Sequence, residues 1–86
     1  MRFVNAGFGN MVSVDSIVAI FAPDSAPIKR NIANSKEKNM VYDATKGDPT
    51  RAVILTKEGY LILSPSLPET IAKRVSGKNV PDIEDS

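Results

Sequence analysis

The sequence predicts an α+β fold, a small and mainly antiparallel β-sheet with two short helices. Short β-branched runs bounded by Gly, Pro, Asn and Asp recur along the chain, which is typical of strands joined by turns. Two further segments carry apolar residues at helical spacing behind a proline suited to a first helical turn. With 86 residues, the chain has room for one domain with a thin core.

Six extended segments are expected, each bounded by turn-forming residues. They are residues 3–4, 11–14, 17–22, 40–44, 51–56 and 60–64. The last two form a hairpin around residues 57–59, where Gly59 is free to take a positive φ. Both strands of this hairpin carry apolar side chains on both faces. The second face must therefore be covered by the helices of this chain or by another subunit.

The first helix is expected to begin at residue 26, with Asp24 or Ser25 as its N-cap and Pro27 in its first turn. Two isoleucines four residues apart, the first of them Ile28, give it an apolar stripe. Asn39 is the expected left-handed residue that ends it.

The second helix is expected after Ser66-Leu67-Pro68-Glu69, which has the pattern of a capping box with Ser66 as the N-cap. Ser76-Gly77 ends it. Residues 1–76 are thus expected to form a single domain. Residues 77–86, which contain Pro81 and three acids, are expected to form a flexible acidic tail.

The composition argues against an enzyme. The chain has no cysteine and no histidine, which removes disulfides, zinc–cysteine clusters and histidine-activated nucleophiles. We therefore expect no cofactor, no bound metal and no small-molecule substrate. No apolar run approaches the length needed to span a bilayer, and the N-terminus lacks a signal-peptide pattern, so a cytoplasmic protein without membrane contact is expected.

Three local patterns could carry other chemistry, and each favours a structural role. Gly7-Phe8-Gly9 lacks the third glycine and the following helix of a phosphate-binding loop, so a tight turn is favoured. Asp43 and Asp48 lie across a loop with few other oxygen ligands, which favours turn formation over a metal site. Ser64 and Ser66 have no histidine or suitably spaced lysine to activate them.

The charges are unevenly distributed. The net charge is +1, but residues 77–86 contribute −2, which leaves +3 on residues 1–76. All of that surplus lies in residues 29–51. Such a segment attracts the phosphates of nucleic acid, although a solvated helix face and loop would show the same pattern. The candidate DNA-binding residues are Lys29, Arg30, Lys46 and Arg51.

Five short blocks of the sequence stand out together. They are Ala6-Gly7-Phe8-Gly9-Asn10, Ser25-Ala26-Pro27-Ile28-Lys29-Arg30, Asp43-Ala44-Thr45, Thr50-Arg51-Ala52-Val53 and Pro68-Glu69-Thr70. In this order and spacing they resemble a family of small bacterial proteins, the RemA-like family, named for regulation of the extracellular matrix. The resemblance covers residues 3–75 without a gap.

The resemblance implies a DNA-binding transcriptional regulator of biofilm-matrix genes. It also implies a fold similar to LytTR DNA-binding domains and a homo-oligomeric ring with duplex DNA on its exterior. The family's loop before Thr50 typically reads glycine-arginine-arginine, whereas Gly47 is followed here by Asp48 and Pro49. A further family arginine corresponds to Ser16. The alternative is therefore an oligomeric structural or protein-interaction member that has lost DNA binding.

Overall fold

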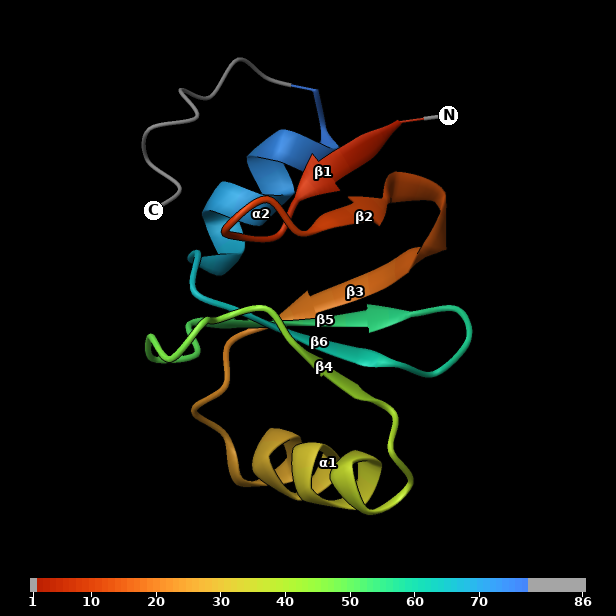
Figure 1. Cartoon of the computed structure of the whole chain (residues 1–86), viewed down its shortest axis with the longest axis vertical. Helices are drawn as coiled ribbons and strands as arrows, with labels where there is room; N and C mark the ends of the chain where they lie inside the picture. Colours follow the sequence, from red (N-terminus) through yellow and green to blue (C-terminus); the bar gives the residue numbers. More distant parts are fainter. Residues whose placement is uncertain (1, 78–86) are drawn as a thin grey trace.

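Three layers make up the fold, with a four-stranded sheet between α1 on one face and the β1–β2 hairpin with α2 on the other (Figure 1). The computed structural model describes residues 2–77. In chain order the elements are β1 (Phe3–Asn5), β2 (Met11–Ser13), a 3-10 turn (Val14–Ser16), β3 (Ile17–Phe21), α1 (Ala26–Glu37), β4 (Val41–Asp43), β5 (Ala52–Thr56), β6 (Leu61–Ser64) and α2 (Pro68–Val75). The α+β class is confirmed, and the expected segments match these elements within about a residue at each end.

The larger sheet has the strand order β3-β5-β6-β4. β3 with β5 and β5 with β6 are antiparallel, while β4 runs parallel to β6 with Val41 opposite Leu61. A parallel partner needs a crossover connection, and the segment containing α1 provides it between β3 and β4. The sheet is therefore mainly antiparallel, as predicted, with one parallel edge.

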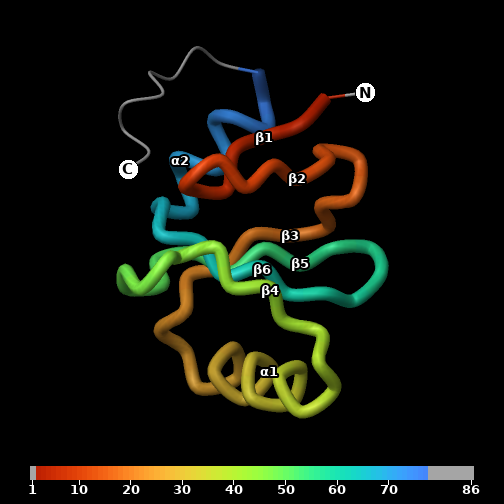
Figure 2. The backbone as a smooth tube through the Cα atoms, viewed as in Figure 1, coloured from red at the N-terminus to blue at the C-terminus, as the bar shows by residue number. Residues whose placement is uncertain are grey.

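The β5–β6 hairpin lies at the centre of the core. On one face, Ile54 and Ile62 pack in a cluster with Val4, Val12 and Ile71, which come from β1, β2 and α2. On the opposite face, Val53, Leu61 and Leu63 pack against the α1 residues Ile28 and Ile32. The backbone trace shows the two covering layers on either side of these strands (Figure 2). Of the two possible covers for the second face, the chain's own helix is the correct one, so the apolar pattern requires no second subunit.

The helix ends agree with the sequence in α1 and differ in α2. The hydroxyl of Ser25 accepts a hydrogen bond from the backbone N–H of Ile28 at 3.4 Å, and Asn39 takes the predicted left-handed conformation at φ 58°. The prediction that Ser66 is the N-cap of α2 is wrong, because the N-cap is Leu67, whose side chain makes no capping hydrogen bond. The backbone N–H of Ser66 instead donates to the hydroxyl of Ser64 at 3.1 Å, which directs Ser66 into the core.

The C-terminal end of α2 is fastened to the first strand by arginines. The guanidinium of Arg2 donates to the carbonyls of Val75 and Arg74 at 2.9 and 2.8 Å. Arg74 in turn donates to the carbonyl of Asn5 at 2.9 Å. A cation at a helix C-terminus also interacts favourably with the helix dipole. The predicted acidic tail begins at Gly77 and otherwise lies outside the described residues.

The turn at Gly7-Phe8-Gly9 is held against the end of β6. The hydroxyl of Ser64, fully buried, donates to the carbonyl of Ala6 at 2.5 Å. The side-chain oxygen of Asn5 accepts from the N–H of Gly7 at 2.9 Å. A Cβ on Gly7 would lie 2.6 Å from Cδ of Pro65, and the φ of Gly7 is +126°. The turn is thus a packing device, which agrees with the structural role predicted for it.

Replacing Gly7 with alanine is expected to destabilise the protein by roughly 2–4 kcal/mol, because a steric overlap adds to an unfavourable backbone conformation. Urea unfolding monitored by circular dichroism measures this. Gly9→Ala is the matched control, since Gly9 also has a positive φ, of 80°, but a Cβ added there would meet no atom within 4 Å. The control should cost only about 1–2 kcal/mol. Equal losses in the two variants would contradict the packing role of Gly7.

Candidate nucleic-acid interface

The loop between β4 and β5 carries two of the candidate residues, Lys46 and Arg51. It begins with Asp43, whose carboxylate accepts hydrogen bonds from the N–H and the hydroxyl of Thr45 at 2.9 and 2.6 Å. A tight turn follows, closed by the N–H of Asp48 donating to the carbonyl of Thr45 at 3.0 Å. Lys46 and Gly47 occupy its centre with φ of 55° and 92°, the left-handed pair that a type I′ turn requires.

The hydrogen bonds from Thr45 hold the pKa of Asp43 below its usual range, against a smaller opposing effect of partial burial and with a minor contribution from the positive charge of Lys36. The carboxylate is therefore committed to the turn. These hydrogen bonds confirm the turn-forming role predicted for Asp43. Among residues 2–77, no group of three or more acidic, histidine or cysteine side chains could hold a metal ion.

Lys46 is positioned by an aromatic side chain that the sequence did not point to. Its ammonium nitrogen lies 5.4 Å from the ring centroid of Phe8, within the range of a cation–π contact. Phe8 itself has a φ of 52° and is 38% exposed at the tip of the glycine turn. The glycine turn and the β4–β5 loop are thus neighbours, and the lysine is held without being neutralised. The sequence feature that could have identified Phe8 is its position as an aromatic residue between two glycines of a turn.

Arg51 ends the same loop. Its N–H donates to the carbonyl of Ser64 at 2.8 Å, which fixes the backbone, while its side chain is exposed. It lines one hollow of 460 Å³ with Asp48 and Thr70, and another of 370 Å³ with Asp24 and Glu69. Carboxylates thus line the same hollows as Arg51, and their negative charge opposes its attraction for phosphate.

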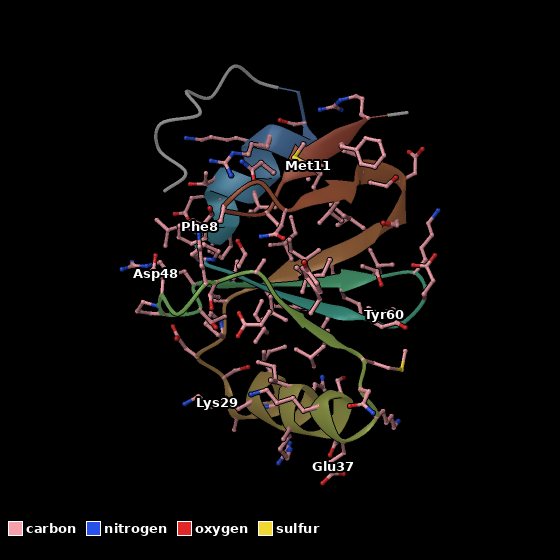
Figure 3. The ribbon with its side chains drawn as sticks, in the orientation of Figure 1. Phe8, Met11, Lys29, Glu37, Asp48 and Tyr60 are labelled. Carbon is pink, nitrogen blue, oxygen red and sulfur yellow. The ribbon has the colours of Figure 1, made fainter. Side chains whose placement is uncertain are left out.

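Lys29 and Arg30 lie in the first half of α1, and both are exposed. The first turn of this helix contains no acidic residue, so the partial positive charge of the helix start adds to theirs. Lys29 and Asp48 project toward the same side of the molecule (Figure 3). Phe8 is drawn on the same side in this view, above Asp48.

The four candidate residues are therefore exposed, and none forms an ion pair with a carboxylate in the described part of the chain. Lys46 and Arg51 belong to one loop, and Lys29 and Arg30 to the helix beyond the sheet. Ser16 does not join them. Its hydroxyl donates to the carbonyl of Ser13 at 2.9 Å, and its own carbonyl accepts from the N–H of Lys57, beyond the other end of β5.

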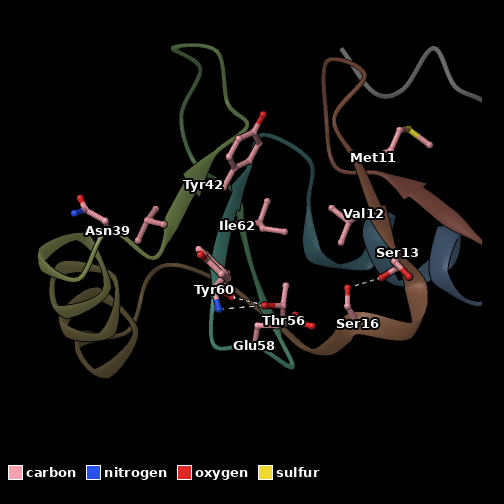
Figure 4. A pocket seen from close by; sticks show the side chains of 11 residues that line it. Met11, Val12, Ser13, Ser16, Asn39, Tyr42, Thr56, Glu58, Tyr60 and Ile62 are labelled. Carbon is pink, nitrogen blue, oxygen red and sulfur yellow. Dashed lines mark hydrogen bonds between the residues drawn. The ribbon is translucent and has the colours of Figure 1, made fainter.

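A further hollow lies between β2 and the β4–β6 edge (Figure 4). This groove has a volume of 460 Å³ and an open, mostly apolar lining. Met11, Tyr42 and Tyr60 are 57%, 55% and 46% exposed beside it. The hydroxyl of Tyr42 donates to the side chain of Asn10 at 3.0 Å and so joins β4 to the glycine turn. No helix among residues 2–77 has the length and apolar character to cross a bilayer.

Comparison with known proteins agrees with the sequence resemblance. The profile of the RemA-like family, described as extracellular matrix regulatory protein A-like, matches residues 3–75. Proteins of Bacillus cytotoxicus, Bacillus mycoides and Bacillus cereus are each 53% identical over 78 residues, which is 91% of this chain and 90% of theirs. Their names assign them a regulatory role and specify neither target nor ligand. The chain therefore belongs to the RemA-like family.

The hydroxyl of Thr45 is expected to control the acid response of the β4–β5 loop. A lowered folded-state pKa of Asp43 contributes stability above the pKa of a free aspartate, about 3.9, and this is lost as pH falls through the lowered value. In Thr45→Val the pKa of Asp43 should rise toward its ordinary value. The chemical shift of the Asp43 carboxyl ¹³C during an acid titration measures this pKa. Thr50→Val, the control, removes a hydroxyl from the same loop and should leave the pKa of Asp43 unchanged. An unchanged pKa in Thr45→Val would contradict the assignment.

Proposed function

We propose that this member of the RemA-like family is a DNA-binding transcriptional regulator of biofilm-matrix genes. It acts as a ring-shaped homo-oligomer that contacts the backbone of duplex DNA. The observation that carries the proposal is the set of four exposed cations, Lys29, Arg30, Lys46 and Arg51, without carboxylate partners among residues 2–77. Family membership supplies the regulatory role.

The chemistry of these residues suits phosphates better than bases. Lysine and exposed arginine side chains neutralise phosphates irrespective of sequence, and each contact releases counterions. Lys46 is held over Phe8, so less side-chain freedom is lost when it meets a phosphate. The partial positive charge at the start of α1 adds to the attraction of Lys29 for an anion.

A single subunit would bind weakly, since the surplus of positive charge is small and Asp48 lies in the same turn as Lys46. Repetition of the surface around an oligomer overcomes this limit. Once one subunit holds the duplex, its neighbours bind at a high effective concentration, so weak contacts sum to a stable complex. The proposal thus joins assembly to DNA binding.

The second candidate function is an oligomeric interaction protein that no longer binds DNA. The position of Asp48 favours it, because this exposed carboxylate lies at the turn where the family typically carries an arginine. In this case the loop would repel phosphate, and partners would be proteins.

Binding is tested by fluorescence anisotropy of a labelled A·T-rich duplex titrated with the full chain at low and near-physiological salt. Affinity should fall steeply with salt, by about 0.9 log units per tenfold salt change for each phosphate contact. Lys46→Ala/Arg51→Ala should weaken binding at least tenfold and reduce the salt slope. Lys57→Ala/Lys73→Ala removes the same charge from elsewhere and should change affinity far less. Equal losses in the two double variants would contradict the assignment of the loop.

The two candidate functions are separated by adding charge to the loop. Asp48→Arg/Pro49→Arg should raise the affinity of a DNA-binding wild type by about tenfold or more, because two phosphate contacts are gained and a repulsion is removed. Wild-type protein that shows no binding at low salt, beside a double variant that binds, would favour the interaction protein. Glu37→Arg in α1 is the control for a non-local effect of charge. It changes the net charge as much as Asp48→Arg alone does, and it should raise the affinity less than that single variant.

A further inference from the structure

The two outer strands of the sheet, β3 and β4, leave backbone groups without a strand partner. In the order β3-β5-β6-β4, each is paired on one side only among residues 2–77. An edge strand presents N–H and C=O groups that can pair with another chain, so proteins usually protect it with charge, proline or covering elements. The question is which segment these two edges accept.

β3 has little protection of that kind. Its sequence, Ile-Val-Ala-Ile-Phe, contains no charge and no proline, and Val18 is 58% exposed. A bulge in the pairing with β5 lies between Ile17 and Ala19, which leaves Ala19–Phe21 as the regular part. This part has the same length as β4, the three residues Val41–Asp43. Each edge therefore offers a segment of three residues.

Charges of opposite sign flank the two edges. Asp15 precedes β3 and Asp24 follows it by three residues. Lys38 precedes β4 by three residues and Lys46 follows it by three. All four side chains are exposed. The pairing tested below concerns the charges ahead of the strands, where β3 is preceded by Asp15 and β4 by Lys38.

The strand directions decide how these charges would meet. β3 is antiparallel to β5, β5 is antiparallel to β6, and β6 is parallel to β4, so β3 and β4 point the same way. Copies related by rotation about one axis along the strands would therefore pair β4 with the β3 of the next copy in parallel. Asp15 of one copy then lies near Lys38 of its neighbour, so opposite charges face each other. Pairing β3 with β3 across a two-fold axis would instead bring Asp15 against Asp24.

We propose that the chain self-associates head to tail, with β3 of one copy added to the β4 edge of the next. This rests on the homo-oligomer in the proposed function and names its surface. The apolar groove beside β4 accommodates the exposed Val18 of the neighbour, because Met11 and Tyr42 line it. Such a heterologous contact closes into a ring when the rotation between copies divides a full turn.

Charge reversal tests the pairing, with the mass of the full chain measured by light scattering after size exclusion without DNA. Asp15→Lys and Lys38→Glu should each raise the dissociation constant of the oligomer at least tenfold, because each places like charges together. The double variant Asp15→Lys/Lys38→Glu should regain most of the wild-type association. Glu69→Lys and Lys73→Glu make the same charge changes on α2 and should leave the mass unchanged. Circular dichroism verifies folding of each variant.

A second variant addresses the strand edge itself. Val18→Lys places a charge on the exposed side of β3 and should dissociate the oligomer without lowering the unfolding temperature. A wild-type oligomer whose mass survives Val18→Lys and both charge reversals overturns the inference and leaves the ring intact. A double variant that stays dissociated overturns the charge pairing. A wild-type monomer at every concentration overturns both this inference and the proposed ring, while DNA anisotropy still decides DNA binding.

Discussion

The structure depends on one constraint, the burial of the β5–β6 hairpin on both faces. Ile54 and Ile62 on one side and Val53, Leu61 and Leu63 on the other cannot be exposed to water while the domain stays folded. Removing a large aliphatic side chain from water contributes roughly 1.5–3 kcal/mol. A chain this short can cover both faces only with thin layers, one helix below and a small hairpin with a helix above. The remaining architecture follows from that requirement.

The placement of the basic surface is one result. The loop that joins β4 to β5 has to return past the glycine turn, because both lie at the end of the sheet where Ser64 receives them. Asp43 and Thr45 then fix the start of the loop, and Phe8 supports Lys46. None of these contacts is required for the core. They order a surface that would otherwise sample many conformations.

Much of the fold could be predicted from the sequence, since β-branched runs, prolines and glycines mark the strands and turns directly. The doubly apolar pattern of β5 and β6 indicated that both faces are covered, and Ser25 and Asn39 marked the ends of α1. The cap of α2 could not be predicted, because Ser66 fits a capping pattern equally well whether or not the backbone turns it inward toward Ser64.

The candidate site was less accessible to such reasoning. Lys29, Arg30, Lys46 and Arg51 could be chosen by charge alone, but charge does not say which of them share a surface. The contact of Phe8 with Lys46 joins residues nearly forty positions apart, and the separation of Ser16 from the β4–β5 loop depends on the direction of β5. These are properties of tertiary packing, which local spacing does not encode.

The fastening of Arg2 to the last turn of α2 has a consequence for synthesis. The two hydrogen bonds from its guanidinium join residues 72 and 73 positions apart, so Arg2 has no partners until α2 has formed. Contacts of such long sequence separation slow folding, because chain entropy is lost before the contact forms. On the ribosome, the nascent chain would expose its apolar hairpin until α2 has been synthesised. The native domain therefore forms only after both its first strand and α2 have left the ribosome.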